Sequence, residues 1–161
     1  MFKHLKNYDK VLVTGPHRSG TTITMRMIAH DTGFTGLDEK VFGFRFIREL
    51  PRVWQASTVL QAPNALPWLP VLVRPEDMVA VVMVRRSIAD ITASVARQKA
   101  PDGRHVQAPV FTAEQGYRLW SSMYKGGFSY LEVNYEDLSD HPLWVPKERR
   151  VGWHHKTWRN E

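Results

Sequence analysis

A nine-residue segment at positions 14–22 constrains the fold of this chain more than any other feature. It reads Thr-Gly-Pro-His-Arg-Ser-Gly-Thr-Thr, follows the apolar run at 11–13, and precedes a helix-like run at 23–30. A strand, a glycine-bounded loop and a helix N-terminus in this order bring several backbone N–H groups to one point, and that arrangement holds a phosphate-like anion. We therefore predict an anion-binding loop between a buried strand and a helix.

The spacing within this segment is close to a known phosphate-binding pattern. Gly15, Gly20 and the two threonines that follow match the formula Gly-x4-Gly-Lys-[Ser/Thr] of a P-loop, except that Thr21 stands at the lysine position. The fixed positive charge lies inside the loop instead, at Arg18. A tight strand-to-helix turn that binds nothing is the plain structural alternative. The displaced charge separates this loop from the lysine-containing P-loops.

Candidate strands and helices alternate along the rest of the chain. We expect strands at 10–14, 57–61, 78–84 and 130–134, and helices at 20–31, 87–99 and 113–125. Gly33 and Gly36 predict a loop leading to Asp38, and Ile88 is expected on the inner face of its helix. The alternation predicts an α/β fold, a three-layer sandwich with a mainly parallel sheet of about four to five strands. The resemblance of the loop at 14–22 to a P-loop implies that this fold is similar to that of P-loop NTPases.

Length and composition place the chain among single-domain globular proteins. The 161 residues, 43% apolar and 24% charged, suffice for one domain at 1–161, with a basic, aromatic tail at about 139–161 whose structure we leave unassigned. No apolar run approaches the ~20 residues of a membrane span, the N-terminus lacks the apolar stretch of a signal peptide, and there is no cysteine. These features predict a cytoplasmic protein, and the net charge of +6 favours an anionic partner.

The run Arg18-Ser19-Gly20-Thr21-Thr22 after a buried strand resembles a loop of one enzyme family. It is the 5′-phosphosulfate loop of sulfotransferases that use 3′-phosphoadenosine 5′-phosphosulfate (PAPS). The spelling of the run is most similar to the branch that contains tyrosylprotein and many bacterial sulfotransferases. The resemblance covers about residues 10–140 and implies the same P-loop-like α/β fold.

A second candidate anion site lies at the end of the expected strand 78–84. Arg86 follows that strand, and Ser94 comes eight residues later on the flank of the next helix. An arginine and a hydroxyl at this spacing can share one phosphate, although a helix opened by Ser87 with surface arginines is the structural alternative. Sulfotransferases bind the 3′-phosphate of PAPS with an Arg and a Ser at this separation and an acidic residue midway, where Asp90 stands here. The resemblance therefore implies one bisphosphorylated nucleotide across the carboxyl edge of the sheet.

The reaction that the resemblance implies is transfer of a sulfuryl group from PAPS to a hydroxyl or amine acceptor, with no metal. Negative charge accumulates in the transition state, so Arg18 is the expected catalytic charge. Asp38 or Glu39 is the expected base, with His17 and His105 as rivals and a solvated acidic turn as the structural alternative. The residues implied in holding the co-substrate are Gly15, His17, Arg18, Ser19, Gly20, Thr21, Thr22, Arg86, Ser94 and Arg150.

The chain departs from the family at several points. Gln61 ends a strand where the family commonly has a lysine, and Arg150 lies in a tail that only faintly resembles the family's Arg-Lys-Gly loop. Tyr135-Glu136-Asp137-Leu138 resembles the family's Tyr-Glu-Asp-Leu element, which we interpret as structural. Family domains are usually longer, so the acceptor pocket is expected to be minimal, supplied by the second subunit of a homodimer, or missing, the last with reduced activity.

Two other classes of function remain open. A P-loop nucleotide or small-molecule kinase would place a lysine on the phosphates and an acidic strand end near Mg²⁺, where this chain has Thr21, Gln61 and Arg86. A basic nucleic-acid-binding module would use the six tryptophans as stacking surfaces. No known nucleic-acid motif is present in the sequence, so this class ranks last.

Overall fold

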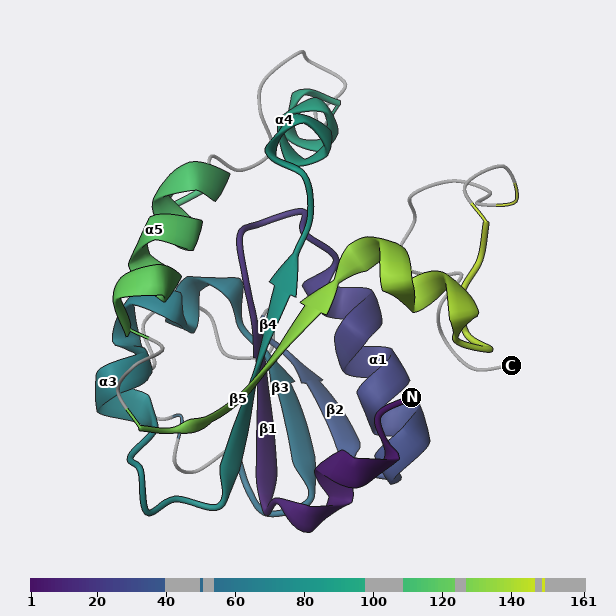
Figure 1. The fold of residues 1–161 in the computed structure, drawn as a ribbon. Coiled ribbons are helices and arrows are strands. Elements are labelled where there is room, and N and C mark those ends of the chain that lie inside the picture. Colours follow the sequence, from purple (N-terminus) through teal and green to yellow (C-terminus); the bar gives the residue numbers. More distant parts are fainter. Residues whose placement is uncertain (40–49, 51–53, 98–108, 124–126, 147–148, 150–161) are drawn as a thin grey trace.

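In the computed structural model, five parallel strands form one sheet with the order β2-β3-β1-β4-β5. The strands are β1 (Lys10–Thr14), β2 (Thr35–Asp38), β3 (Thr58–Gln61), β4 (Val79–Arg85) and β5 (Ser129–Asn134). The structure describes residues 1–39, 50, 54–97, 109–123, 127–146 and 149. The prediction of an α/β fold around a parallel sheet is confirmed (Figure 1).

The two strands that carry the predicted anion sites are neighbours in the middle of the sheet. β1 and β4 pair in parallel, from Lys10 opposite Val79 to Thr14 opposite Met83. Six successive residues of β4, 79–84, are buried. Such a continuous apolar run is typical of a parallel strand with helices over both of its faces. The register places the carboxyl end of β4 directly beside the end of β1, where the loop 14–22 begins.

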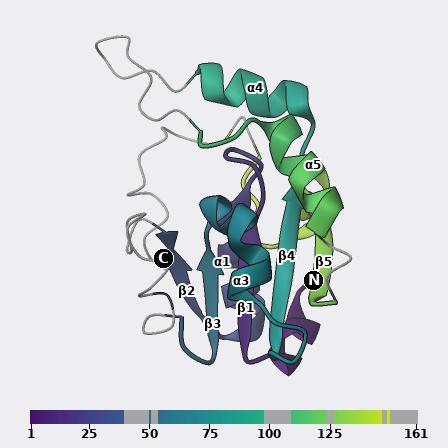
Figure 2. The same cartoon turned by 90° about the vertical axis from the view of Figure 1, so that its left-hand side faces the viewer.

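Helices cover both faces of this sheet (Figures 1 and 2). One face carries α1 (Thr21–Thr32) with the 3-10 helices η1 (Lys3–Asn7) and η6 (Tyr135–Asp140), and the other carries η4 (Pro63–Trp68), α3 (Leu69–Leu72) and α5 (Ala113–Met123). Met27 of α1 packs with Val13 on the first face, and Trp120 of α5 packs with Leu60 on the second. None of the helices in the described residues is long and apolar enough to cross a membrane. A further helix, α4 (Ile88–Ala96), lies beyond the carboxyl ends of the strands.

Two local predictions from the sequence are wrong. The segment after α1 is the strand β2 rather than a loop, because it pairs along its whole length with β3. It forms the edge of the sheet and its side chains are exposed or half-buried, so it lacks the apolar run of a central strand. Ile88 is 47% exposed rather than inward-facing, because α4 stands above the strand ends and buries Ile91 and Ser94 instead.

The segment that follows β5 packs against the body of the domain as far as it is described. His141 is buried at the end of η6, accepts the N–H of Leu143 on Nδ1, and contacts Asp31 of α1 through Nε2 at 3.1 Å. The Trp144 ring lies edge-on to the ring of Tyr135. The first part of the expected tail at 139–161 is therefore ordered structure, and its later residues lie outside those described, Arg149 excepted.

Candidate functional site

The loop between β1 and α1 packs directly against the backbone and rings of its neighbours. Gly15 has a φ of +146°, and a Cβ atom there would lie 2.7 Å from the carbonyl oxygen of Val84 in β4. Gly20 has a φ of +108° at the N-cap of α1, and a Cβ atom there would overlap the ring of Tyr135. Glycine at both positions satisfies the left-handed backbone and the close approach. The loop glycines therefore have a structural reason independent of any ligand.

Polar side chains of the loop turn inward. Ser19 is fully buried, and its Oγ has no hydrogen-bond partner among the described residues. Thr21 is also buried, and its Oγ1 accepts a hydrogen bond from Gln61 Nε2 at 3.0 Å. The Oε1 atom of Gln61 is buried without a partner in the described part of the chain. Such unpartnered polar atoms carry a desolvation penalty that a bound ligand would offset.

Three arginines converge beside this loop. Arg18 Nε donates a hydrogen bond to Ser94 Oγ at 3.2 Å, and Arg86 Nη1 donates to the backbone carbonyl of Arg18 at 3.2 Å. Burial lowers the pKa of Arg18, and the positive charges of Arg86 and Arg97 lower it further. Like charges that are held together in a partly buried place repel, and a bound anion offsets that repulsion.

Arg86 is held from two further directions. Its guanidinium lies over the ring of Tyr135, 4.3 Å from the ring centroid. The hydroxyl of Tyr117 in α5 accepts a hydrogen bond from Arg86 N at 2.8 Å and donates one to Arg86 O at 2.7 Å. The Nε atom of Arg86 is buried and has no partner among the described residues. This buried donor therefore carries a desolvation penalty that no described residue offsets.

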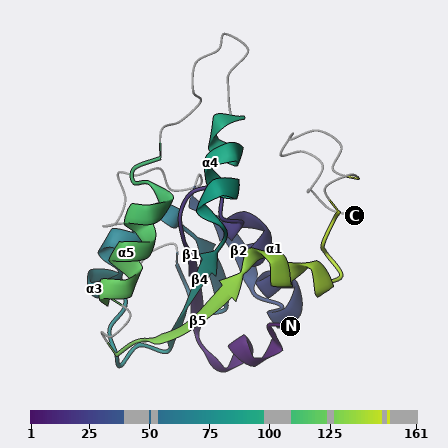
Figure 3. The same cartoon turned by 45° about the horizontal axis from the view of Figure 1, so that its top comes forward.

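The structure brings together most of the residues that the sequence assigns to nucleotide binding. Gly15, Ser19, Gly20 and Thr21 form the loop, and Arg18, Ser94 and Arg86 are connected by direct hydrogen bonds beside it. Thr22 lies in the first turn of α1. Figure 3 shows α4, which carries Ser94, next to the turn that follows β1. The residues of the two predicted anion sites, which come from separate parts of the sequence, therefore lie beside one another.

The two predicted bases, Asp38 and Glu39, lie at the carboxyl ends of the strands, as the loop 14–22 does, but at the outer strand β2. Asp38 ends β2 and stands in register with Gln61, which in turn pairs with Val13 of β1. Two strand spacings amount to roughly 10 Å, which separates Asp38 from the end of β1. Burial lowers the pKa of Arg26 in α1, and the charge of Asp38 acts in the opposite direction, so these two side chains are electrostatically coupled. Glu39 follows Asp38 and is half-buried.

The histidines and the tail arginine that the sequence suggested do not join the arginine cluster. His17 Nε2 lies 2.6 Å from Asn64 Oδ1 of η4, and its ring is near that of Phe111. Its position is within the loop but directed toward η4. His105 and Arg150 lie outside the described residues. Asp90 serves the helix itself, because its backbone N–H and its carboxylate both bond the hydroxyl of Ser87 at the N-cap of α4.

Sequence reasoning missed three contributors to this site. Arg97, one residue beyond α4, adds a third positive charge. Tyr117 fixes the backbone of Arg86, and the ring of Tyr135 is close both to Gly20 and to the Arg86 guanidinium. Arg97, the C-cap residue of α4, comes three residues after Ser94, and this spacing is a local signal that places both near one face of the helix. Tyr117 offers no comparable signal, because its contact joins two distant parts of the chain.

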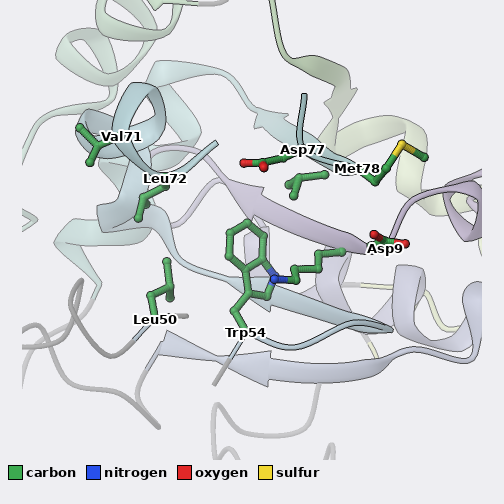
Figure 4. Close-up of a pocket in the computed structure, with 9 residues that line it drawn as sticks. Asp9, Leu50, Trp54, Val71, Leu72, Asp77 and Met78 are labelled. Atoms are coloured by element: carbon green, nitrogen blue, oxygen red, sulfur yellow. The ribbon is translucent and has the colours of Figure 1, made fainter. Parts of the chain in front are cut away.

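A separate pocket of about 320 Å³ lies at the amino ends of the strands β1 and β4 (Figure 4). Trp54, Leu72 and Val79 line its apolar part, and Asp9 and Lys10 lie at the amino end of β1. The Lys10 ammonium lies 5.5 Å from the centre of the Trp54 ring. None of the residues that line this pocket belongs to the candidate site around the loop 14–22. The chemistry predicted from the sequence therefore concerns the carboxyl edge of the sheet and not this pocket.

Two solved structures with a similar fold are kinases. The chain is similar to a sugar kinase from Janibacter sp., with 13% identity, a TM-score of 0.50, and coverage of 79% of this chain and 85% of that one. It is also similar to a shikimate kinase from Acinetobacter baumannii in complex with shikimate, with 14% identity, a TM-score of 0.52, and coverage of 83% and 87%. The sequence matches no protein-family model, and no curated protein sequence is significantly similar to it. At these identities the likeness establishes a P-loop-like α/β fold and leaves the chemistry to the site.

Proposed function

We propose that this protein is a sulfotransferase that moves a sulfuryl group from PAPS to a hydroxyl or amine acceptor. The observation that carries the proposal is the convergence of Arg18, Arg86 and Ser94 through direct hydrogen bonds at the ends of β1 and β4. Two buried donors at this point, Ser19 Oγ and Arg86 Nε, have no partner among the described residues. A compact cluster of positive charge with donors to spare suits a ligand with several anionic oxygens.

The proposed roles follow the direction of each group. The loop N–H groups, Ser19 and the threonines at 21 and 22 bind the 5′-phosphosulfate at the N-terminus of α1. Arg86 and Ser94 bind the 3′-phosphate. The Arg18 guanidinium, which rests on Ser94, turns toward the sulfonate and stabilises the charge that develops on the transferred group and the bridging oxygen.

The acceptor binds on the β2 side of the loop in this proposal. Asp38 ends the edge strand there and is the proposed base that takes the proton from an attacking hydroxyl, with Glu39 as its neighbour. The acceptor oxygen forms a bond to sulfur as the bond from sulfur to the bridging oxygen breaks, and adenosine 3′,5′-bisphosphate leaves. The proton of the hydroxyl ends on the carboxylate.

Phosphoryl transfer from a nucleoside triphosphate to a small molecule is a second candidate. The specific observation in its favour is that the similar structures named above are a sugar kinase and a shikimate kinase. Its difficulty lies in the site, because Thr21 replaces the phosphate-binding lysine, and β3 and β4 end in Gln61 and Arg85 rather than in a carboxylate for Mg²⁺. The fold favours the kinase, and the charges of the site favour the sulfotransferase.

Isothermal titration calorimetry separates the two candidates. Sulfuryl transfer requires tight binding of adenosine 3′,5′-bisphosphate in the presence of EDTA, at least tenfold tighter than that of adenosine 5′-monophosphate. Phosphoryl transfer requires binding of ATP that depends on Mg²⁺, with no gain from a 3′-phosphate. Assays with ³⁵S-labelled PAPS and a panel of sugars, tyrosine peptides, alcohols and amines then identify the acceptor. Mg²⁺-dependent ATP binding together with indifference to the 3′-phosphate would overturn the sulfotransferase proposal.

A further inference from the structure

We propose that Tyr117 is a positioning residue for the anion site, and that it acts by fixing the backbone of Arg86. The hydroxyl of Tyr117 forms two hydrogen bonds with Arg86, one from the backbone N–H at 2.8 Å and one to the carbonyl oxygen at 2.7 Å. This inference rests on the proposed function, because it takes Arg86 as the ligand of the 3′-phosphate. The inference gives the helix α5, for which the sequence predicts only packing against the sheet, a part in ligand binding.

The position of Arg86 in the sheet explains why it needs such a partner. β4 pairs with β5 as far as Arg85 opposite Asn134, and Arg86 comes directly after that pair. The chain then enters α4 at Ile88, so Arg86 lies between a strand and a helix, where regular hydrogen bonding changes over. Tyr117 satisfies both backbone groups of Arg86 with one hydroxyl, as a neighbouring strand would.

The hydroxyl can serve both bonds only while it carries its proton. Burial raises the pKa of Tyr117, and the charges of Arg85 and Arg86 act in the opposite direction without reversing the shift. The hydroxyl is therefore protonated at neutral pH and able to donate to the carbonyl of Arg86. The guanidinium of Arg85 lies over the Tyr117 ring at 5.1 Å and helps to hold the ring in place.

The backbone of Arg86 sets the direction of the guanidinium. Its side chain is already held at two points, on the ring of Tyr135 and on the carbonyl of Arg18, with Nε left over. A long side chain converts a small backbone rotation into a large displacement of its end. Loss of the Tyr117 hydroxyl would therefore displace the Arg86 guanidinium from a bound phosphate, even though Tyr117 itself does not touch the ligand.

The test compares the affinities of wild type and Tyr117→Phe for adenosine 3′,5′-bisphosphate and adenosine 5′-monophosphate by calorimetry. Phenylalanine keeps the ring and its packing and removes the hydroxyl alone. We expect the affinity for the bisphosphate to fall roughly tenfold, as for the loss of one ordinary to strong hydrogen bond, and the affinity for the monophosphate to stay within about twofold. Tyr8→Phe, a half-buried tyrosine beside η1 at the other edge of the sheet, is the matched control and should change neither affinity.

A double-mutant cycle with Arg86→Ala decides whether Tyr117 acts through Arg86. If it does, adding Tyr117→Phe to Arg86→Ala leaves the affinity for the bisphosphate unchanged. A purely structural role predicts parallel losses for both nucleotides, or a further tenfold loss in the Arg86→Ala background, and either result overturns the inference. A wild-type protein that does not distinguish the two nucleotides overturns the proposed function as well. If the wild type prefers the bisphosphate and Tyr117→Phe shows the same preference, only the role of Tyr117 is overturned.

Discussion

Arg86 Nη1 donates a hydrogen bond to the backbone carbonyl of Arg18 across 3.2 Å, although the two residues are 68 positions apart in the sequence. Each belongs to a different junction between a strand and a helix, β1 to α1 and β4 to α4. The bond means that the shape of the loop and the position of the second arginine are not independent. A ligand that draws either guanidinium toward itself acts on both junctions at once.

Arg18→Ala should abolish transfer with only a modest loss of co-substrate affinity. The guanidinium of Arg18 is the proposed charge on the transferring sulfonate, and loss of one preorganised donor of this kind lowers kcat by about 10²–10³. Its backbone, with a φ of +71°, remains in the loop of the variant. The rate is measured with ³⁵S-labelled PAPS, and affinity by calorimetry with adenosine 3′,5′-bisphosphate. An unchanged kcat would exclude Arg18 from the reaction.

Arg86→Ala should chiefly weaken binding of the 3′-phosphate. A hydrogen bond to a charged group contributes about 1.5–3 kcal/mol, so the affinity for adenosine 3′,5′-bisphosphate is expected to fall roughly 10- to 100-fold. Arg74→Ala is the matched control, because Arg74 is exposed and precedes β4, at the amino end of the sheet rather than at the carboxyl ends of the strands. That variant removes one exposed positive charge and should bind within about twofold of wild type. Equal losses in the two variants would indicate a general effect of positive charge rather than a site.

The sequence is a good guide to the elements of this fold that bury long apolar runs. The apolar run of β4 and the loop at 14–22 predict the centre of the sheet and the carboxyl ends of the strands where the candidate site lies. The edge strand β2 escaped prediction because its four residues, with Gly36 among them, are exposed or half-buried and resemble a loop. Strand pairing with β3 outweighs the weak local preference of such a segment.

The sequence indicates which residues belong to the candidate site, but it does not predict the hydrogen bonds between them. Arg18, Arg86 and Ser94 stand out because charged and hydroxyl groups follow strands or flank a helix. Their mutual hydrogen bonds depend on how α4 stands over the strand ends, which no local pattern encodes. Tyr117 belongs to the same class, since its contact with Arg86 arises only when α5 packs against the second face of the sheet.

Gly20→Ala should destabilise the fold and prevent nucleotide binding together. The methyl group would overlap the ring of Tyr135, and the backbone has a φ of +108°, so the combined cost is roughly 2–5 kcal/mol. Gly36→Ala is the control, because its methyl group would meet the sulfur of Met25 at 2.5 Å, which is the flexible part of a side chain that can turn away. Urea unfolding should show a loss below about 1.5 kcal/mol for that variant. Comparable losses in both variants would show that the contact between Gly20 and Tyr135 is not special.

The hydrogen bonds around Asp31 predict a stability that depends on pH. Its carboxylate accepts the N–H of Phe2 at 2.7 Å, contacts His141 Nε2 at 3.1 Å, and lies 3.0 Å from the amino group of Met1. Burial alone would raise the pKa of Asp31, but these hydrogen bonds and that of His30 together lower it below its ordinary value. The carboxylate thereby connects the end of α1 with η1 and with the end of η6.

A lowered pKa in the folded state makes the direction of the effect definite. The charged carboxylate stabilises the fold above its ordinary pKa of about 4, and this contribution is lost as the pH falls below that value. Asp31→Asn should therefore lower the free energy of unfolding at pH 7 by about 1–3 kcal/mol, and the difference from wild type should shrink toward pH 3. Urea unfolding across this range measures both quantities, with Glu76→Gln, at an exposed position before β4, as the control. Curves for Asp31→Asn and wild type that stay parallel down to pH 3 would contradict the assignment.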